Sequence, residues 1–238
     1  MKAVRTPWRR MAIAAIATVL AGPILLAGCS SDDNSDATPE ELADRLAAAK
    51  TQLDEAASIE FELAADELPD DVTGLLDAEG TGTHDPAFEG NVSVSALGGV
   101  DADVIAIGDD VYAKVSFSPS YTPVDPADLG APNPAILFDP DAGVTTFLTS
   151  TDDLEAGEQS RDGDLVLSTV TGTLPGDIVQ RLIPTADESA DFDVEYRITD
   201  DDALHDAVMV GPFYGDAGDV TYTMSLSASD ESVEITAP

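Results

Sequence analysis

One residue of this chain has a type and a position that point to covalent chemistry: Cys29, its single cysteine. It ends the motif Leu26-Ala27-Gly28-Cys29, which resembles the lipobox where a bacterial signal peptide is cut just before a cysteine that carries a diacylglyceryl group. Four cations and no acid stand in residues 1–10, and an apolar run from Met11 to Leu26 follows, as in a secretory signal peptide. We therefore predict a lipoprotein signal peptide over residues 1–28 and lipid attachment at Cys29.

The alternative for the apolar run is a transmembrane helix followed by an incidental cysteine. The run is shorter than the ~20 residues that a membrane-spanning helix needs, and it contains Gly22-Pro23. We prefer the signal peptide, so that Cys29 becomes the first residue of the mature chain. A diacylglyceryl group with an additional N-acyl chain anchors a protein firmly, because one chain alone gives only marginal binding. We expect an extracytoplasmic protein anchored to the cell membrane by its N-terminal lipid.

The charge of the mature chain limits its partners. Removal of residues 1–28 leaves 238 − 28 = 210 residues with 10 − 4 = 6 basic and 47 acidic side chains, a formal charge of 6 − 47 = −41. Nucleic acids and anionic membrane surfaces are poor partners for such a protein. The dispersed acids indicate a solvated surface. Calcium binding is the alternative, but no stretch fits a calcium-binding loop and Asp139-Pro140-Asp141 falls short of one, so we expect no metal and no cofactor.

The sequence lacks a recognisable catalytic constellation. His84 and His205 are isolated, and there is no Gly-x-Ser-x-Gly or Ser-x-x-Lys motif. Carboxylate pairs could be drawn from 47 acids almost at will, so none of them is informative. We expect that the protein is not an enzyme; an extracytoplasmic hydrolase would need a nucleophile bonded to one of the two histidines.

Three segments of the mature chain are predicted to be helices. The first, residues 39–57, begins with a capping box from Thr38 to Glu41 and carries apolar residues at helical spacing. The second, residues 142–154, follows Asp139-Pro140, and the third, residues 176–183, lies between two prolines. Each has one apolar side, so each is expected to cover another element.

The remaining segments read mainly as antiparallel strands with one apolar face, because apolar and polar residues alternate from residues 59, 92 and 111 onward and again after residue 191. Residues 102–107 are apolar at nearly every position, which predicts a strand covered on both sides, and the proline-rich residues 119–134 are too irregular for sheet or helix. After a polar tether over residues 29–37, residues 38–238 form one α+β domain. We predict a large curved antiparallel sheet, a half-barrel, with about three helices over its concave face.

Small aliphatic residues dominate the apolar positions of these elements, and aromatic residues make up 5% of the chain. A curved sheet covered by helices through small side chains can enclose an apolar cavity. A filled core is the alternative, and the pattern of apolar residues does not decide between the two.

Several segments resemble the LppX/LprA/LprF/LprG lipoprotein family of mycobacteria and their relatives. They include residues 90–94, the Gly98-Gly99 turn, residues 101–104 and 111–115, Asp125-Pro126-Ala127, residues 137–144 and the Arg161-Asp162-Gly163 turn, in the family's order. The resemblance implies a half-barrel with an apolar cavity, similar to the LolA and LolB lipoprotein carriers. It also implies binding of cell-envelope lipids or glycolipids and transport toward the outer envelope, in some members beside a major-facilitator exporter.

The resemblance and the periodicity together suggest which residues line that cavity. By position within the family, Val92 would face the cavity near its mouth. The further candidates, chosen from periodicity, are Ile105, Ile107, Val144, Phe147, Ile178 and Leu182.

We therefore expect a monomeric, membrane-anchored carrier of lipids or glycolipids with two or three acyl chains. Lys114 is the sole base in the predicted central strands, so neutral or glycosylated headgroups are favoured over strongly anionic ones. The alternative is a surface-interaction or structural lipoprotein with a solid core, whose acidic face contacts envelope components.

Overall fold

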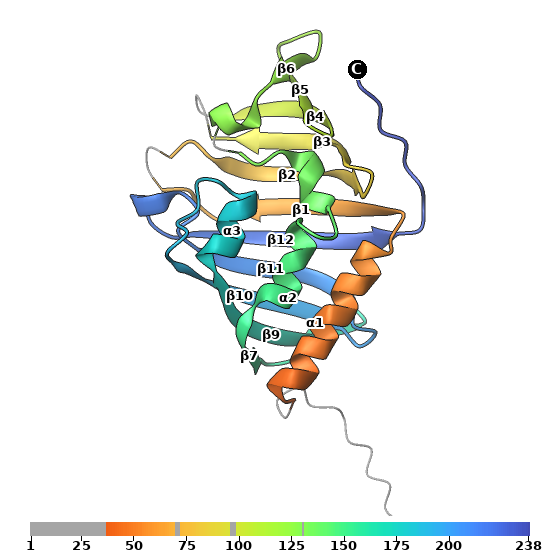
Figure 1. The fold of residues 1–238 in the computed structure, drawn as a ribbon, viewed down its shortest axis with the longest axis vertical. Helices are drawn as coiled ribbons and strands as arrows, with labels where there is room; N and C mark the ends of the chain where they lie inside the picture. The colour runs from red at the N-terminus through yellow and green to blue at the C-terminus, as the bar shows by residue number, and fades with distance from the viewer. Residues whose placement is uncertain (1–36, 70–71, 96–98, 130) are drawn as a thin grey trace, which may run out of the picture. The chain divides into compact units, whose positions relative to one another are not determined.

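The computed structural model describes residues 37–69, 72–95, 99–129 and 131–238, which form one large antiparallel sheet with helices on one of its faces (Figure 1). The helices are α1 (Pro39–Asp54), α2 (Phe147–Ser150) and α3 (Gly176–Leu182). The strands are β1 (Ser58–Ala65), β2 (Leu75–Thr83), β3 (Ala87–Val94), β4 (Val100–Ile107), β5 (Asp110–Val115), β6 (Thr122–Val124), β7 (Asp152–Ala156), β8 (Ser160–Asp162), β9 (Leu165–Pro175), β10 (Asp191–Thr199), β11 (Leu204–Gly211) and β12 (Val220–Ser229). Short 3-10 helices η3 (Pro126–Leu129), η4 (Pro134–Phe138), η5 (Val144–Thr146) and η6 (Gly215–Ala217) lie in the connections.

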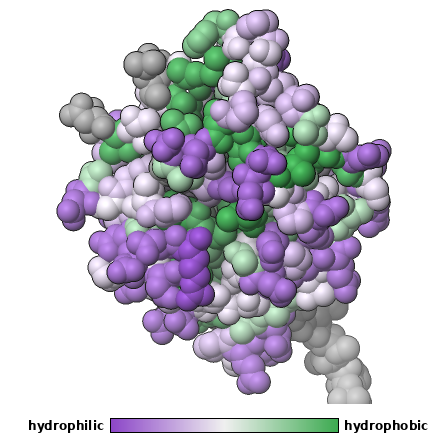
Figure 2. Space-filling view, turned by 45° about the horizontal axis from the view of Figure 1, so that its top comes forward, coloured by the Kyte–Doolittle hydropathy of each residue, from purple (hydrophilic) through white to green (hydrophobic). Residues whose placement is uncertain are grey.

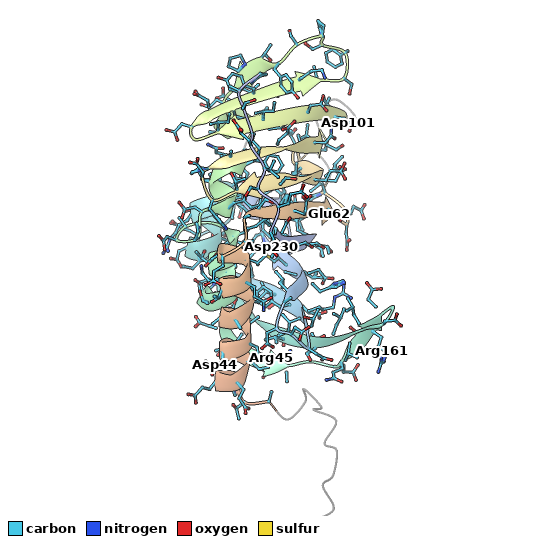
Figure 3. All side chains as sticks on the ribbon, turned by 90° about the vertical axis from the view of Figure 1, so that its right-hand side faces the viewer. Asp44, Arg45, Glu62, Asp101, Arg161 and Asp230 are labelled. Carbon is cyan, nitrogen blue, oxygen red and sulfur yellow. The ribbon has the colours of Figure 1, made fainter. Side chains whose placement is uncertain are left out.

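The strands follow the order β6-β5-β4-β3-β2-β1-β12-β11-β10-β9-β7, and β8 pairs with β9. All the pairings are antiparallel, and β12 closes the two meanders by pairing with both β1 and β11. Figure 3 shows α1 on one side of the curved sheet, while labelled charged residues such as Glu62 and Asp101 project from the other side. We call these sides the helix face and the outer face. The predicted α+β class, with an open curved sheet and three helices, is confirmed.

The capping box predicted before the first helix is present at the start of α1. The Thr38 amide donates to Glu41 Oε2 (2.8 Å), and the Glu41 amide donates to Thr38 Oγ1 (3.3 Å), while Pro39 occupies the first helical turn. One stripe of the helix is fully buried, as predicted: Leu42, Leu46, Ala49 and Leu53. The helix ends at Asp54, three residues before the predicted end.

The second predicted helix, residues 142–154, is wrong in its length. Asp139 Oδ1 accepts from the amides of Asp141 (2.8 Å) and Ala142 (3.0 Å), which makes a tight turn instead of a helix start. Helical structure is limited to η5 and α2, because the Thr151 hydroxyl donates to the Phe147 carbonyl (2.8 Å) and the chain then becomes extended as β7. Pairing with β9 thus overrides the helical spacing. The irregular residues 119–134 likewise contain the short edge strand β6.

The core between the helices and the sheet contains an aromatic cluster near β1, β2 and β3. The rings of Phe61, Phe88 and Phe138 lie 5.7–6.3 Å apart, and those of Phe88 and Phe138 are stacked. Gly82 makes this approach possible, since a Cβ atom there would lie 2.2 Å from the Phe138 ring. Both the rings and the α1 stripe are almost fully buried, so the helix face is well packed in this region.

Candidate functional site

The helix face of strands β1 to β5 carries an apolar stripe that crosses the strands in direct register. It consists of Leu63, Ala78, Val92, Ala102 and Val115. Four strand spacings of about 4.8 Å give it a length of about 19 Å. Ala78 and Ala102 are buried between neighbours, whereas the three larger side chains are half-buried and reach solvent. The stripe is therefore an apolar strip accessible from the surface, somewhat longer than the ~15 Å depth of one leaflet of a ~30 Å hydrocarbon core.

The remaining apolar residues of this half of the sheet lie in rows parallel to the stripe. The next row contains Phe61, Gly80, Gly90, Val104 and Ala113. A Cβ atom at Gly80 or Gly90 would lie 2.6–2.7 Å from the Phe88 ring, so these glycines leave the space in which that ring lies. The row of residues beside the stripe thus contains glycines that are covered by an aromatic ring.

Five of the seven predicted cavity residues lie on the helix side of the sheet. Val144, Phe147 and Leu182 belong to the buried core, Ile178 packs against it from α3, and Val92 lies in the apolar stripe. The structure does not gather them around one space, because α2 and α3 contact β9 whereas Val92 is on β3, in the other half of the sheet.

Ile105 and Ile107 lie on the outer face, so the structure corrects their proposed place beside Val92. Ile105 is paired with Glu89 and Tyr112, in the opposite register position from Val104 and Ala106. Residues 102–107 are apolar at every position except Asp103, and such a run carries little alternation from which to read the face. The helix-face residues of β4 are Ala102, Val104 and Ala106.

Buried apolar side chains lie between the helices and strands β9 to β12. The buried cluster there includes Val179, Phe192, Tyr196, Met209 and Leu226. Two hollows that described residues line, of about 480 and 210 Å³, both lie on the outer face among acidic side chains such as Asp193 and Glu79. The apolar cavity predicted between sheet and helices is therefore not among these hollows.

Two tyrosines hold the start of β2, next to the stripe. The Leu75 amide donates to Tyr214 Oη (3.1 Å), and Tyr222 Oη donates to the Leu75 carbonyl (2.7 Å). Because the Tyr222 proton is used in this way, Tyr214 donates to Tyr222 across 2.7 Å. Burial and the neighbouring Tyr214 raise the pKa of Tyr222 well above its usual value, so the Tyr222 hydroxyl stays neutral. This ring of hydrogen bonds fixes the backbone at one end of the half-exposed apolar surface.

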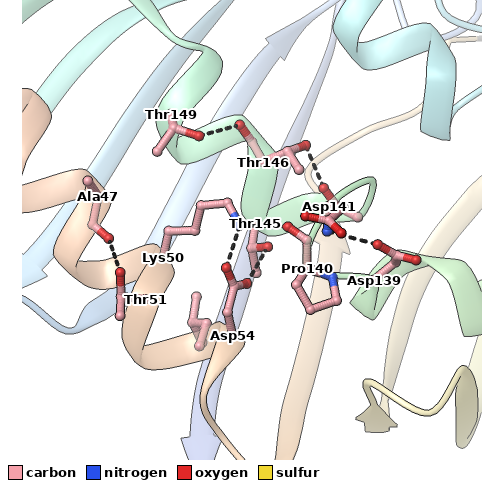
Figure 4. Close-up of polar contacts among 12 residues, drawn as sticks. Ala47, Lys50, Thr51, Asp54, Asp139, Pro140, Asp141, Thr145, Thr146 and Thr149 are labelled. Atoms are coloured by element: carbon pink, nitrogen blue, oxygen red, sulfur yellow. Dashed lines mark hydrogen bonds and ion pairs between the residues drawn. The ribbon is translucent and has the colours of Figure 1, made fainter.

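A polar network ties α1 to the segment that leads into α2 (Figure 4). Lys50 Nζ donates to Asp54 and to the Pro140 carbonyl (2.6 Å), and Thr145 Oγ1 donates to Asp54 Oδ1 (2.9 Å). We call these four residues the α1–η5 latch. Their hydrogen bonds, in addition to apolar packing, hold α1 and the η5–α2 segment together over the helix face.

Both histidines form hydrogen bonds with carbonyl or carboxylate oxygens, and none of these bonds involves a hydroxyl group. His84 Nδ1 is 2.7 Å from the Phe138 carbonyl and Nε2 is 3.1 Å from that of Leu53, so its ring links η4 to the end of α1. His205 is bonded to the buried carboxylate of Asp206 (2.6 Å) and lies 3.3 Å from Asp162. Their surroundings fit structural roles. Among the residues that the structure describes, no three acidic or histidine side chains are grouped so as to hold a metal ion.

Lys114, the sole base in the predicted central strands, is directed away from the stripe. It lies on the outer face and pairs with Asp103 (2.8 Å), which also accepts from Asn91 (3.1 Å). The hydrogen bond from Lys114 lowers the pKa of the Asp103 carboxyl below its usual range. Lys114 therefore places no positive charge on the helix face of β1 to β5.

Cys29 and the predicted signal peptide lie outside the described residues. Within the described part of the chain, no helix is both long and apolar enough to cross a membrane. The sequence motif therefore remains the basis of the lipid-attachment prediction.

Comparisons with known proteins connect this geometry to a family. A model of the LppX_LprAFG lipoprotein family matches residues 39–235. The lipoarabinomannan carrier protein LprG of Mycolicibacterium hassiacum is 27% identical, over 94% of this chain and 97% of that protein. The crystal structure of LprF from Mycobacterium bovis superposes with a TM-score of 0.65 at 17% identity, over 84% of this chain and 97% of LprF. The crystal structure of LppX from Mycobacterium tuberculosis superposes with a TM-score of 0.61 at 17% identity, over 84% of this chain and 100% of LppX.

Proposed function

The chain belongs to the LppX_LprAFG lipoprotein family, and we propose that it is a non-enzymatic, membrane-anchored carrier that binds the acyl chains of cell-envelope lipids or glycolipids on the helix face of its sheet. The observation that carries this proposal is the half-exposed apolar stripe. The similarity to a protein named as a lipoarabinomannan carrier supports the same class of ligand.

The chemistry of the stripe suits an acyl chain. Its five side chains are all aliphatic, and each methylene group that they shield from water contributes about 0.8 kcal/mol. The stripe continues in register into the buried residues Met224 and Ala207, so a bound chain would lie against the existing core. Binding of this kind needs no catalytic group.

The headgroup and the anchor complete the proposal. Lys114 faces the outer side and is paired, so a neutral or glycosylated headgroup fits the end of the stripe better than a strongly anionic one. Lipid attachment at Cys29 would keep the domain near the bilayer from which its ligand comes, on the extracytoplasmic side.

The cluster of buried apolar side chains beneath α1, α2 and α3 favours a second candidate function. A lipoprotein with a solid core that contacts envelope components through its acidic outer face would need no internal ligand. The two functions differ in whether lipid co-purifies with the protein.

The test is to extract the purified protein with organic solvent and to identify the bound lipid by mass spectrometry. Val92→Trp places a bulky ring in the stripe and is expected to reduce the lipid recovered. Ser93→Trp is the matched control, since Ser93 is the next residue of the same strand and lies on the outer face between Asp77 and Asp101.

Both variants should retain the wild-type circular dichroism spectrum, because each side chain is half-exposed. Equal lipid content in the two variants would remove the stripe as the binding surface. A wild-type protein free of lipid would instead support the solid-core alternative.

A further inference from the structure

The turn between β5 and β6 presents a large aromatic side chain to solvent. Phe117 is 84% exposed, compared with 37–55% for the exposed leucines and isoleucine of the described residues. The turn around it is well bonded, since the Ser118 amide donates to the Val115 carbonyl (2.8 Å) and the Ser118 hydroxyl to the Ser120 carbonyl (3.0 Å). The fold therefore holds an apolar ring outward at a fixed place, which is unusual for a surface that contacts only water.

This turn lies within the longest stretch without an acid after Asp32. Fourteen residues, from Val111 to Val124, contain no Asp or Glu, in a chain with 47 acids. A second acid-free stretch, of eleven residues, runs from Gly90 to Val100. Antiparallel pairing brings the two together, because Val92 and Val115 both pair with Ala102.

Apolar side chains gather where these stretches meet. Leu75, Val94 and Val100 are in register on the helix face, beside Val92 and Val115 at the end of the stripe, and all five are half-buried. We call these five residues, together with Phe117, the apolar corner. Figure 2 shows apolar surface gathered in the upper part of the molecule, toward the end that carries β4, β5 and β6, while hydrophilic residues dominate below it.

We propose that the apolar corner is a surface that contacts a lipid bilayer, with Phe117 entering the boundary between headgroups and acyl chains. The predicted mature chain, with a formal charge of −41, is repelled by an anionic membrane over most of its surface, and the corner is where that repulsion is smallest.

A bilayer fits the corner better than a protein partner does. The corner offers aliphatic and aromatic surface with no free charge to orient a partner, whereas the acidic outer face offers charge in abundance. The corner is also continuous with the apolar stripe through Val92 and Val115, so an acyl chain could pass between bilayer and stripe without crossing the acidic face.

The corner and the start of α1 lie at opposite ends of the sheet. In Figure 1, α1 begins near β7, whereas β5 and β6 lie at the opposite end of the sheet. Contact through the corner requires no bound ligand, so it stands or falls independently of the proposed carrier function.

The test uses a single tryptophan as a reporter. Trp8, the sole tryptophan of the chain, lies in the predicted signal peptide, so the mature Phe117→Trp variant has one tryptophan, at the corner. The matched control is Leu165→Trp, because Leu165 is 47% exposed but follows the acidic turn that contains Asp162 and Asp164. The full, lipid-modified chain is reconstituted into phosphatidylcholine and phosphatidylglycerol vesicles, with brominated acyl chains either in these vesicles or in a second, added population.

We expect bromine in at least one of the two vesicle populations to quench the fluorescence at position 117 and to leave that at position 165 unchanged. Addition of Ser118→Asp should abolish the quenching, and the circular dichroism spectra should match. Equal quenching at both positions, or none at position 117, would overturn the proposal, as would a blue-shifted but unquenched signal, which indicates burial against protein. Lipid extracted from the same variants reports on the carrier function separately.

Discussion

Thr145 offers a quantitative test of the α1–η5 latch. Its side chain is 1% exposed, and Oγ1 donates to Asp54 Oδ1 at 2.9 Å. Thr145→Val keeps the shape and removes this hydrogen bond. A hydrogen bond to a charged group contributes about 1.5–3 kcal/mol. Asp54 keeps Lys50 as a partner and its side chain is 21% exposed, so water replaces part of the loss and the lower value applies.

We therefore expect Thr145→Val to lower the free energy of unfolding by about 1.5 kcal/mol. At 2–4 °C per kcal/mol for a domain of this size, the melting temperature should fall by about 3–6 °C. Urea denaturation followed by circular dichroism measures the first quantity, and calorimetry measures the second. The slope of the urea transition should stay the same, because the latch does not change the surface that unfolding exposes.

Thr149→Val is the matched control for this measurement. Thr149 is exposed and its hydroxyl bonds to the Thr146 carbonyl at 3.4 Å, so its loss should change the stability by less than about 0.5 kcal/mol. If both variants lose the same stability, the exchange of a hydroxyl for a methyl group in this segment, and not the loss of the buried bond, is responsible. If Thr145→Val is as stable as the wild type, the latch does not hold the cover of the helix face.

Two further predictions concern the start of β2 and the start of α1. Tyr214→Phe leaves the Leu75 amide without its acceptor, so we expect a loss of about 1–2 kcal/mol in urea denaturation and faster hydrogen exchange of that amide; unchanged exchange would show that the tyrosine ring of hydrogen bonds does not fix β2. The backbone hydrogen bond at the helix cap lowers the pKa of Glu41 from its usual 4.5. A carboxyl whose pKa is lowered by folding stabilises above its unfolded pKa and loses this effect as the pH falls through its folded pKa. The wild type should therefore melt above Glu41→Gln at neutral pH, and the difference should shrink below about pH 4; a difference that stays constant in acid would contradict this origin.

The elements that sequence predicted well are those set by local chemistry. The capping box between Thr38 and Glu41 and the buried stripe of α1 depend on residues within a few positions of one another, and both are present. The alternation after residues 59, 92 and 111 predicted strands for the same reason. These features need no knowledge of what the segment packs against.

The features that sequence missed are set by distant partners. Residues 152–156 form β7 because β9 is available for pairing, and nothing within residues 142–154 reports that. The face on which Ile105 lies depends on its pairing with Glu89 and Tyr112. Whether small residues leave a cavity depends on which side chains cover them. The Phe88 ring occupies the space above Gly80 and Gly90, which the sequence alone could not show.

The acidity of the chain and its apolar stripe arise from one alternating pattern. Glu62 precedes Leu63 on β1, Glu79 follows Ala78 on β2, and Asp103 follows Ala102 on β4, so each acid is one residue from the stripe and on the other face of the sheet. Because the side-chain period is two, a slip of one residue in the pairing would bring the acids onto the helix face and the stripe onto the outer face. The register of β1 to β5 therefore gives a strongly acidic protein an uncharged apolar surface on its helix face, and the buried rings of Phe61, Phe88 and Phe138 on the same face favour that register over its alternatives.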